Sequence, residues 1–194
     1  MIIGLTGQTG AGKSTVCEFL RQMSFCVIDC DKVAREVTEK GSPLLNKLAD
    51  AFGSDIILED GSLNRRLLAS RAFSSEQKTE LLNKITHPEI LSAIKQKIEG
   101  SPCEIKVLDA PTLFESGADK LCDRIIAVLC DENKRKDRIV ARDNLSCEQA
   151  DARLSRAKSN EFFIERADAV VYNDGTLDEL ENNIKAALNQ IGVV

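Results

Sequence analysis

The sequence predicts an α/β fold in which a doubly wound sheet of about five parallel strands carries a helical insertion and a helical lid. Two observations support this prediction. Short apolar, β-rich runs begin at Ile2, Cys26, Ile105, Ile125 and Ala169. Stretches with helical periodicity separate most of these runs, and such alternation is typical of a parallel sheet. The first run also leads directly into a glycine-rich phosphate-binding signature, which belongs between a strand and a helix.

This signature occupies residues 7–14 and satisfies G-x-x-x-x-G-K-[ST] at every fixed position. The glycines let successive backbone N–H groups face an anion, and a helix expected from about Lys13 to Met23 directs its positive end there. We expect Lys13 to neutralise β- and γ-phosphate oxygens and the Ser14 hydroxyl to bind Mg²⁺. The expected ATP-binding residues of this P-loop are Gly7, Gly10, Ala11, Gly12, Lys13, Ser14 and Thr15. A glycine turn without a ligand is the alternative, but it requires neither lysine nor serine.

The 194 residues fit a single unit with insertions better than two independent domains. We expect a core of about residues 1–32, 102–130 and 168–194, an insertion of about 33–101 and a lid of about 131–167. The insertion breaks the strand–helix alternation and predicts consecutive helices at about 43–52, 64–73, 76–85 and 88–99, around the turn at Asp60-Gly61. Capping-box spacings at Ser74–Gln77, Ser146–Gln149 and Thr176–Glu179 mark three helix starts.

Three aspartates follow predicted strands, at the edge of the sheet where doubly wound folds bind ligands. Asp109 closes an apolar run as a Walker B acid does, and we expect it to hold Mg²⁺ through water. A turn or N-cap role before Pro111 is the alternative for this carboxylate. Asp29 and Asp31 end the second run, where Asp31 either caps the next helix or takes the proton of an acceptor hydroxyl. Its place facing the P-loop favours the second role.

Residues 134–158 hold eight basic and four acidic side chains in an otherwise acidic chain. Arg135, Arg138 and Arg142 fall on one helix face, and Ser146 starts a second helix with an apolar stripe. The pair predicts a hinged flap whose arginines clamp a triphosphate and exclude water. A solvated helix pair with routine surface ion pairs is the alternative.

Composition excludes several other classes of protein. The net charge is −5, the eight aromatic residues include no tryptophan, and both facts disfavour a nucleic-acid partner. Seven cysteines without C-x-x-C spacing, and only one histidine, predict reduced thiols that serve neither metal binding nor disulfides. Because the longest apolar run is far below the ~20 residues of a membrane span, we expect a soluble, cytoplasmic protein, with no obligate protein partner implied.

The ordered motifs resemble those of the dephospho-CoA kinase family, over nearly the whole chain. The resemblance begins at residues 3–7 and the P-loop, and continues through residues 27–31 with Ala34-Arg35, Leu63-Asn64-Arg65-Arg66 and His87-Pro88. It ends with residues 108–111, Leu113-Phe114-Glu115, Arg142-Asp143, Ala167-Asp168 and Asn173. The resemblance implies a P-loop kinase fold that uses ATP and Mg²⁺ to phosphorylate the ribose 3′-hydroxyl of dephospho-CoA, the last step of coenzyme A synthesis.

The family resemblance assigns roles residue by residue. It implies that Asp31 is the base, that the lid arginine Arg142 closes over ATP, and that the inserted helices receive the acceptor. With Lys13, these two residues form the expected catalytic set, and Arg142 and Asn173 are candidates for the adenine side. The expected acceptor-binding residues are Asp31, Arg35, Arg65, Arg66, His87, Asp109 and Phe114. For Arg65 and Arg66 a place flanking a helix start, and for His87 a structural role, stay open.

Three departures from the family pattern limit these assignments. Thr112 replaces a usual leucine, Ala157 replaces a usual glutamine of the lid, and Gln8-Thr9 replaces a more common Gly-Ile. A nucleoside or nucleoside monophosphate kinase is the alternative activity. A nucleotide-dependent switch is disfavoured, because both N-K-x-x segments, residues 46–49 and 83–86, lack the final acid of a guanine-reading N-K-x-D motif.

Overall fold

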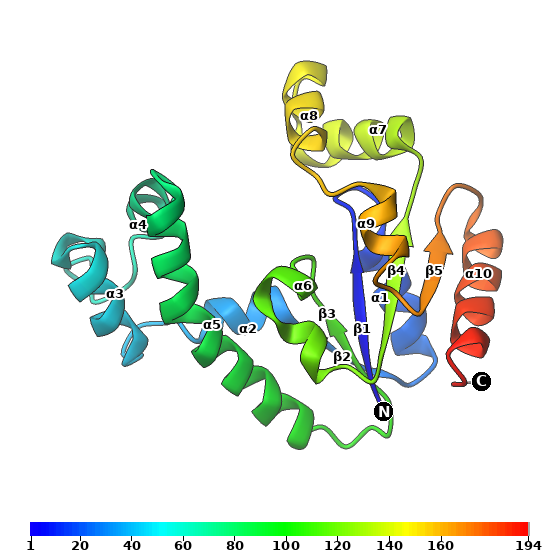
Figure 1. Cartoon of the computed structure of the whole chain (residues 1–194), viewed down its shortest axis with the longest axis horizontal. Helices are drawn as coiled ribbons and strands as arrows, with labels where there is room; N and C mark the ends of the chain where they lie inside the picture. Colours follow the sequence, from blue (N-terminus) through cyan, green and yellow to red (C-terminus); the bar gives the residue numbers. More distant parts are fainter. Residues whose placement is uncertain (194) are drawn as a thin grey trace. The chain divides into compact units, whose positions relative to one another are not determined.

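The computed structural model describes residues 1–193 and divides into two compact units, each described here by itself (Figure 1). The sheet unit comprises Met1–Ile28 and Ser101–Val194, and the helical unit comprises Asp29–Gly100. No helix within residues 1–193 combines the length and the apolar character needed to cross a bilayer.

The sheet unit contains the five strands that the sequence predicts. They are β1 (Ile2–Gly7), β2 (Cys26–Asp29), β3 (Lys106–Asp109), β4 (Arg124–Leu129) and β5 (Ala169–Tyr172). Their spatial order is β2-β3-β1-β4-β5, with β1 parallel to both β3 and β4, and β4 parallel to β5. The predicted α/β fold with about five parallel strands is confirmed. Since β1 has its sequence-distant neighbours on either side, the strand order reverses there, and the carboxyl end of β1 is where such folds bind ligands.

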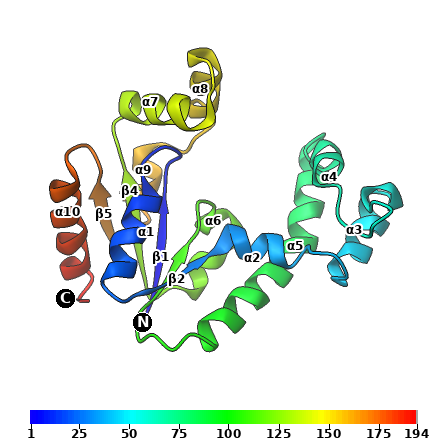
Figure 2. The ribbon, with the colours of Figure 1, turned by 180° about the vertical axis from the view of Figure 1, so that it is seen from behind.

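Helices cover both faces of this sheet (Figures 1 and 2). On one face α1 (Lys13–Gln22) and α10 (Leu177–Gln190) pack on alternate residues of the strands, such as Ile3 and Leu5. The other face carries α6 (Leu113–Ser116), η2 (Ala118–Leu121) and α9 (Asn160–Ile164). Gly4 points to that second face, where a Cβ atom would lie 2.7 Å from Leu113 Cδ2. This close approach requires a glycine in the central strand.

The predicted lid is the helix pair α7 (Glu132–Asp143) and α8 (Cys147–Leu154). Ile139 of α7 packs on Ala150 and Leu154 of α8, which is the apolar stripe seen in the sequence. Between the helices Asn144 adopts a left-handed conformation, with φ 52°. Ser146 and Gln149 form the predicted capping box, so this helix start is confirmed.

The helical unit consists of α2 (Cys30–Glu36), α3 (Leu44–Phe52), η1 (Ser54–Ile56), α4 (Arg65–Ala72) and α5 (Glu76–Glu99). Leu48, Phe52, Ile56 and Leu68 form its small core. Two details of the prediction are wrong. Two helices were expected on either side of Pro88, whereas α5 is continuous through Pro88. The missing proline N–H removes one helical hydrogen bond, but the helix has packed apolar residues on both sides of Pro88: Ile85 packs on the core of this unit, and Ile94 is buried.

The N-cap of α5 is the second wrong detail. Ser75, not Ser74, accepts the hydrogen bond from the Lys78 N–H. The Ser74 hydroxyl instead donates to the Arg71 carbonyl and ends the preceding helix. The predicted capping box at the start of α10, Thr176 with Glu179, is present.

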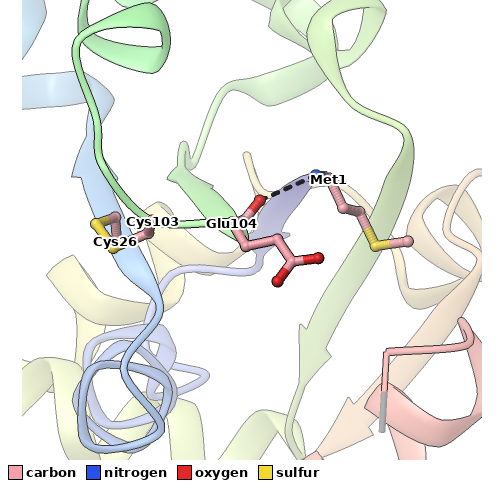
Figure 3. Close-up of a disulfide and its surroundings, with 4 residues drawn as sticks. All are labelled: Met1, Cys26, Cys103 and Glu104. Atoms are coloured by element: carbon pink, nitrogen blue, oxygen red, sulfur yellow. Dashed lines mark hydrogen bonds between the residues drawn. A yellow bond between two sulfur atoms is a disulfide. The ribbon is translucent and has the colours of Figure 1, made fainter.

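A disulfide joins Cys26 to Cys103, with their Cα atoms 5.8 Å apart (Figure 3). The expectation that all seven cysteines are reduced is therefore wrong for this pair. The two residues are 77 positions apart, and only the pairing of β2 with β3 brings them together. Sequence spacing carries no signal for such a contact. The other five cysteines are free thiols.

Candidate functional site

The P-loop lies between the carboxyl end of β1 and the start of α1. Gly10 and Gly12 have φ angles of 80° and 87°, which L side chains rarely adopt. A Cβ atom on Gly7 would lie 2.3 Å from the Val128 carbonyl oxygen of β4. Gly12 is the N-cap of α1 and offers no side chain to cap it, so the first N–H groups of the helix are left to a ligand. An anion with several oxygens fits this arrangement.

Two side chains from distant segments hold the carbonyl groups of the P-loop. Asn173, which follows β5, donates to the Ala11 carbonyl at 2.8 Å. Arg138 of α7 donates to the carbonyls of Gly10 and Ala11 at 3.4 Å and to the Asn173 carbonyl at 3.1 Å. The Ala11 N–H donates to the Gln8 carbonyl at 3.1 Å, so of these two peptides the one between Ala11 and Gly12 can present its N–H group to the loop interior. The sequence placed Arg138 on one helix face with Arg135 and Arg142, but it did not show which of the three meets the P-loop.

Lys13 and Asp109 form an ion pair at the carboxyl edge of the sheet. Lys13 begins α1 and Asp109 ends β3, the strand next to β1. Their side chains are only 15% and 17% exposed. Cys17, one turn further along α1, lies beside them: burial, and then the Asp109 charge, raise the pKa of its thiol to about 12. The capping alternative for Asp109 is not observed, because the N-cap of α6 is Thr112.

In the helical unit, Asp29 rather than Asp31 caps α2. The Asp29 carboxylate accepts a hydrogen bond of 2.8 Å from the Lys32 N–H. Asp31 is the second residue of α2 and is exposed. The capping alternative for Asp31 is therefore wrong, because Asp29 holds the N-cap position.

The other predicted acceptor residues of the helical unit are distributed over α2, α4 and α5. Arg65 donates to the Arg35 carbonyl at 3.1 Å and so links α4 to the end of α2. The side chains of Arg35, Arg65 and Arg66 are exposed. His87 is half-buried in α5, and desolvation lowers the pKa of its imidazole.

Arg142, the predicted lid arginine, lies at the end of α7 and forms a bidentate pair with Asp143 at 2.8 and 2.9 Å. Arg153 of α8 binds the same carboxylate at 2.5 Å. Hydrogen bonds from Arg142 hold the pKa of the Asp143 carboxyl below its ordinary value. Arg142 is 59% exposed. The structure thus places Arg138, and not Arg142, against the P-loop.

Arg135, another arginine of the predicted lid face, is buried next to the P-loop. Arg135 of α7 is only 4% exposed, and its main chain touches Gly10. Its nearest acid is Glu132 at 3.6 Å, and its Nε and Nη1 atoms have no hydrogen-bond partner within residues 1–193. Gln8 of the P-loop donates to the Lys158 carbonyl at 3.0 Å. The P-loop therefore contacts the segment after α8. This contact does not need the side-chain amide of the glutamine that Ala157 replaces.

Phe114 of α6 belongs to an aromatic cluster on one face of the sheet. Its ring meets the Phe162 ring edge-to-face, with centroids 5.6 Å apart. The guanidinium of Arg166 lies 4.3 Å from the Phe162 centroid. The cluster joins α6 to α9 across β4 and gives the sheet unit one apolar wall.

These features can bind and position a nucleoside triphosphate. The P-loop offers N–H donors and Lys13 to the phosphates, while Ser14 and Asp109 offer the oxygen ligands that Mg²⁺ prefers. Exposed carboxylate and guanidinium groups in the helical unit suit a polar, anionic acceptor. The arrangement therefore supports phosphoryl transfer from a nucleotide to a second substrate.

Comparisons with known proteins agree with this chemistry. The family model described as dephospho-CoA kinase matches residues 1–179. A dephospho-CoA kinase of Bacillus cereus is 39% identical over 197 residues, which cover 100% of this chain and 98% of the relative. A crystal structure from Thermus thermophilus shares 31% identity at a TM-score of 0.84, covering 98% of this chain and 97% of the other. A dephospho-CoA kinase from Campylobacter jejuni, 24% identical over 98% and 96% of the two chains, has the same fold, with a TM-score of 0.71.

Proposed function

From the premise that this chain belongs to the dephospho-CoA kinase family, we propose that it transfers the γ-phosphoryl group of ATP to the ribose 3′-hydroxyl of dephospho-CoA. The products are coenzyme A and ADP, and the proposed location is the cytoplasm. The observation that carries the proposal is the P-loop at the carboxyl end of β1, with Lys13 paired to Asp109 beside it. A lysine and a carboxylate at this point serve a phosphate and its metal ion.

On the donor side, P-loop N–H groups and Lys13 hold the β- and γ-phosphates, and Asn173 keeps the loop in its binding conformation. The residues fit Mg²⁺, because Ser14 offers a hydroxyl and Asp109 a carboxylate at 17% exposure. Mg²⁺ supplies charge neutralisation of the phosphate oxygens when bound. Lys13 leaves Asp109 for the phosphates as the nucleotide binds. Phe114 contributes an apolar wall to the acceptor.

On the acceptor side, Asp31 orients the 3′-hydroxyl and accepts its proton. In a loose phosphoryl-transfer transition state this proton leaves late, so the carboxylate acts mainly by positioning. Arg35, Arg65 and Arg66 bind the acceptor phosphates, and His87 lines the acceptor pocket in its neutral form. This assignment of Asp31 is supported by Asp29, which already supplies the N-cap of α2.

The lid completes the donor site. Arg142 exchanges its bond to Asp143 for the transferring phosphoryl group, and closure excludes the water that would otherwise hydrolyse ATP. The support for this role is that Asp143 keeps a second cation, Arg153, when Arg142 leaves. The exchange therefore leaves no unpaired carboxylate in the lid.

The direct test is ADP formation with a panel of acceptors. Purified protein with MgATP is given dephospho-CoA, nucleosides or nucleoside monophosphates in separate reactions. Only dephospho-CoA is expected to support rapid turnover. Faster turnover with a nucleoside or a nucleoside monophosphate would show that the proposed acceptor is wrong, although the protein would still be a kinase.

Asp31 is tested by a matched pair of substitutions that remove the same charge two residues apart. Asp31→Asn is expected to lower kcat by about 10²-fold. Asp29→Asn keeps an N-cap acceptor and is expected to retain near-normal kcat. Equal kcat values for the two variants would remove Asp31 from the chemical step.

A further inference from the structure

The disulfide between Cys26 and Cys103 lies where the chain passes between the two units. Cys26 begins β2, and the sheet unit ends its first segment two residues later, at Ile28. The chain returns at Ser101, and Cys103 follows two residues later. The bond therefore closes a single loop that contains the whole helical unit. No other pair among the described cysteines is bonded.

The two bonded cysteines are more exposed than most of the unbonded ones. Cys26 and Cys103 are half-buried, and the neighbours of Cys103 in sequence, Pro102 and Glu104, are exposed. By contrast Cys17, Cys30 and Cys130 are buried. Burial raises the pKa of the Cys17 thiol to about 12 and that of Cys130 to about 11, so neither supplies a thiolate at neutral pH. A disulfide needs no thiolate of its own, since an external thiolate attacks it.

The strand ends around the bond are also held by the main chain. The Cys26 N–H donates to the Ile105 carbonyl at 3.1 Å. The Met1 ammonium donates to the Glu104 carbonyl at 3.0 Å (Figure 3). The Lys106 N–H donates to the Met1 carbonyl at 3.0 Å. Because these bonds do not involve the sulfur atoms, we expect the sheet to keep its register when the sulfur–sulfur bond opens.

We propose that Cys26–Cys103 is a thiol–disulfide exchange site for low-molecular-weight thiols. Coenzyme A and its precursor belong to this class because both carry a terminal thiol. The choice of these two thiols rests on the proposed function, but the exchange reaction itself does not depend on that function. The thiolate of one small thiol attacks one sulfur, forms a mixed disulfide and releases the other cysteine as a thiolate, which takes a proton. A second small thiol releases the remaining cysteine. Two electrons and two protons pass to the protein, and the small thiols leave as their disulfide.

Opening the bond removes a covalent constraint on both connections of the helical unit. The P-loop, β1 and α1 lie outside the closed loop, so ATP affinity is expected to stay within twofold. The helical unit lies inside it, so the KM for dephospho-CoA is expected to rise severalfold in Cys26→Ala or Cys103→Ala, which are permanently open. Small thiols that open the disulfide would therefore weaken the binding of dephospho-CoA. In this way the redox state of the thiol pool would control acceptor binding.

The test uses the oxidised full-length protein without ATP, so that kinase turnover plays no part. The protein is incubated with millimolar coenzyme A, quenched in acid, alkylated and mapped by mass spectrometry. New alkylated thiols are expected at Cys26 and Cys103, with a coenzyme A adduct on one of them at early times. Cys147→Ser, which removes the exposed free thiol, is the control and is expected to respond as the wild type does.

Two results would overturn the proposal. One is a disulfide that persists in millimolar thiol until urea unfolds the protein, which would make it a purely structural bond. The other is an adduct confined to Cys147. Thermal unfolding of the reduced protein and of Cys26→Ala shows whether both remain folded during the measurement. Equal KM values for dephospho-CoA in the two redox forms would overturn the coupling to acceptor binding.

Discussion

The residues proposed for the donor and those proposed for the acceptor differ in how deeply they are buried. Around the P-loop, Asn173 and Arg138 bind the loop carbonyls, and Lys13 is paired with Asp109 with little exposure. In the helical unit the charged side chains assigned to the acceptor, Asp31, Arg35, Arg65 and Arg66, are all exposed. The residues proposed for the donor are therefore enclosed by long-range contacts, whereas the charged side chains proposed for the acceptor lie at the surface.

This difference has a consequence for kinetics. Enclosed groups lose little entropy when they meet the nucleotide, so a change there lowers both ATP affinity and kcat. Exposed arginines of the acceptor site lose side-chain entropy on binding, so their substitution is expected to appear mainly in the KM for the acceptor. The following four predictions test this division, from the largest expected effect to the smallest.

Lys13→Ala is expected to have the largest effect. It removes the cation at the β- and γ-phosphates and leaves Asp109 without its partner, so kcat/KM should fall by about 10³-fold. Lys185→Ala, in an exposed i,i+4 ion pair of α10, is the control and should keep wild-type kinetics. Both are measured by ADP release at varied ATP. A loss below tenfold for Lys13→Ala would contradict the proposed donor site.

Arg142→Ala is expected to lower kcat by about 10- to 100-fold, because the lid then lacks the cation for the transferring phosphoryl group. Arg153→Ala breaks the other bond to the same carboxylate, Asp143, and is expected to change kcat less than twofold. Comparing the two variants distinguishes a role of Arg142 at the phosphates from a role in holding the lid helices together. Similar losses in the two variants would favour the structural role and the alternative of a solvated helix pair.

Asn173→Ala is expected to act on both stability and ATP affinity. The Ala11 carbonyl loses its 2.8 Å donor and keeps only the 3.4 Å bond from Arg138, which costs about 0.5–1.5 kcal/mol. The loosened P-loop should raise the Kd for ATP severalfold. Asn183→Ala removes a comparable 2.8 Å bond to the Tyr172 carbonyl and should leave ATP affinity unchanged. Urea unfolding and calorimetric titration measure the two quantities; an unchanged Kd in Asn173→Ala would separate this bond from nucleotide binding.

His87 is expected to give the smallest effect, a pH dependence of stability. Desolvation lowers the pKa of His87 in the folded state below its ordinary value of 6.5, so the unfolded chain binds the proton first as the pH falls. Stability therefore declines as the pH drops below about 6.5 toward the lower folded-state pKa. His87→Asn should remove this component of the slope, measured as the difference in Tm between pH 7.5 and pH 5.5. An unchanged slope would show that other groups produce it.

The local patterns of the sequence predicted most of the fold. Strand starts, the P-loop and the lid turn near Asn144 follow from short-range rules, namely apolar runs, glycine spacing and helix caps. The continuity of α5 through Pro88 did not follow, because a local rule places a helix boundary before a proline. In this case the packing of α5 within the helical unit outweighs one missing hydrogen bond.

The contacts that organise the candidate site are long-range, and this is why the sequence did not contain them. Asn173 reaches Ala11 across 162 positions, and Lys13 reaches Asp109 across 96. The motifs named these residues as candidates, but only the order of the strands determines which of them meet. The same reason explains the missed disulfide between Cys26 and Cys103, and why the sequence did not show that Arg138, rather than Arg142, lies against the P-loop.

The most direct measurement of the central claim is the position of the phosphate in the product. Purified protein is incubated with MgATP and dephospho-CoA, and the product is examined by ³¹P and proton NMR. The account predicts stoichiometric ADP and a new phosphomonoester coupled to the ribose 3′ proton. Phosphate on another oxygen, or ADP with inorganic phosphate and unchanged dephospho-CoA, would contradict it.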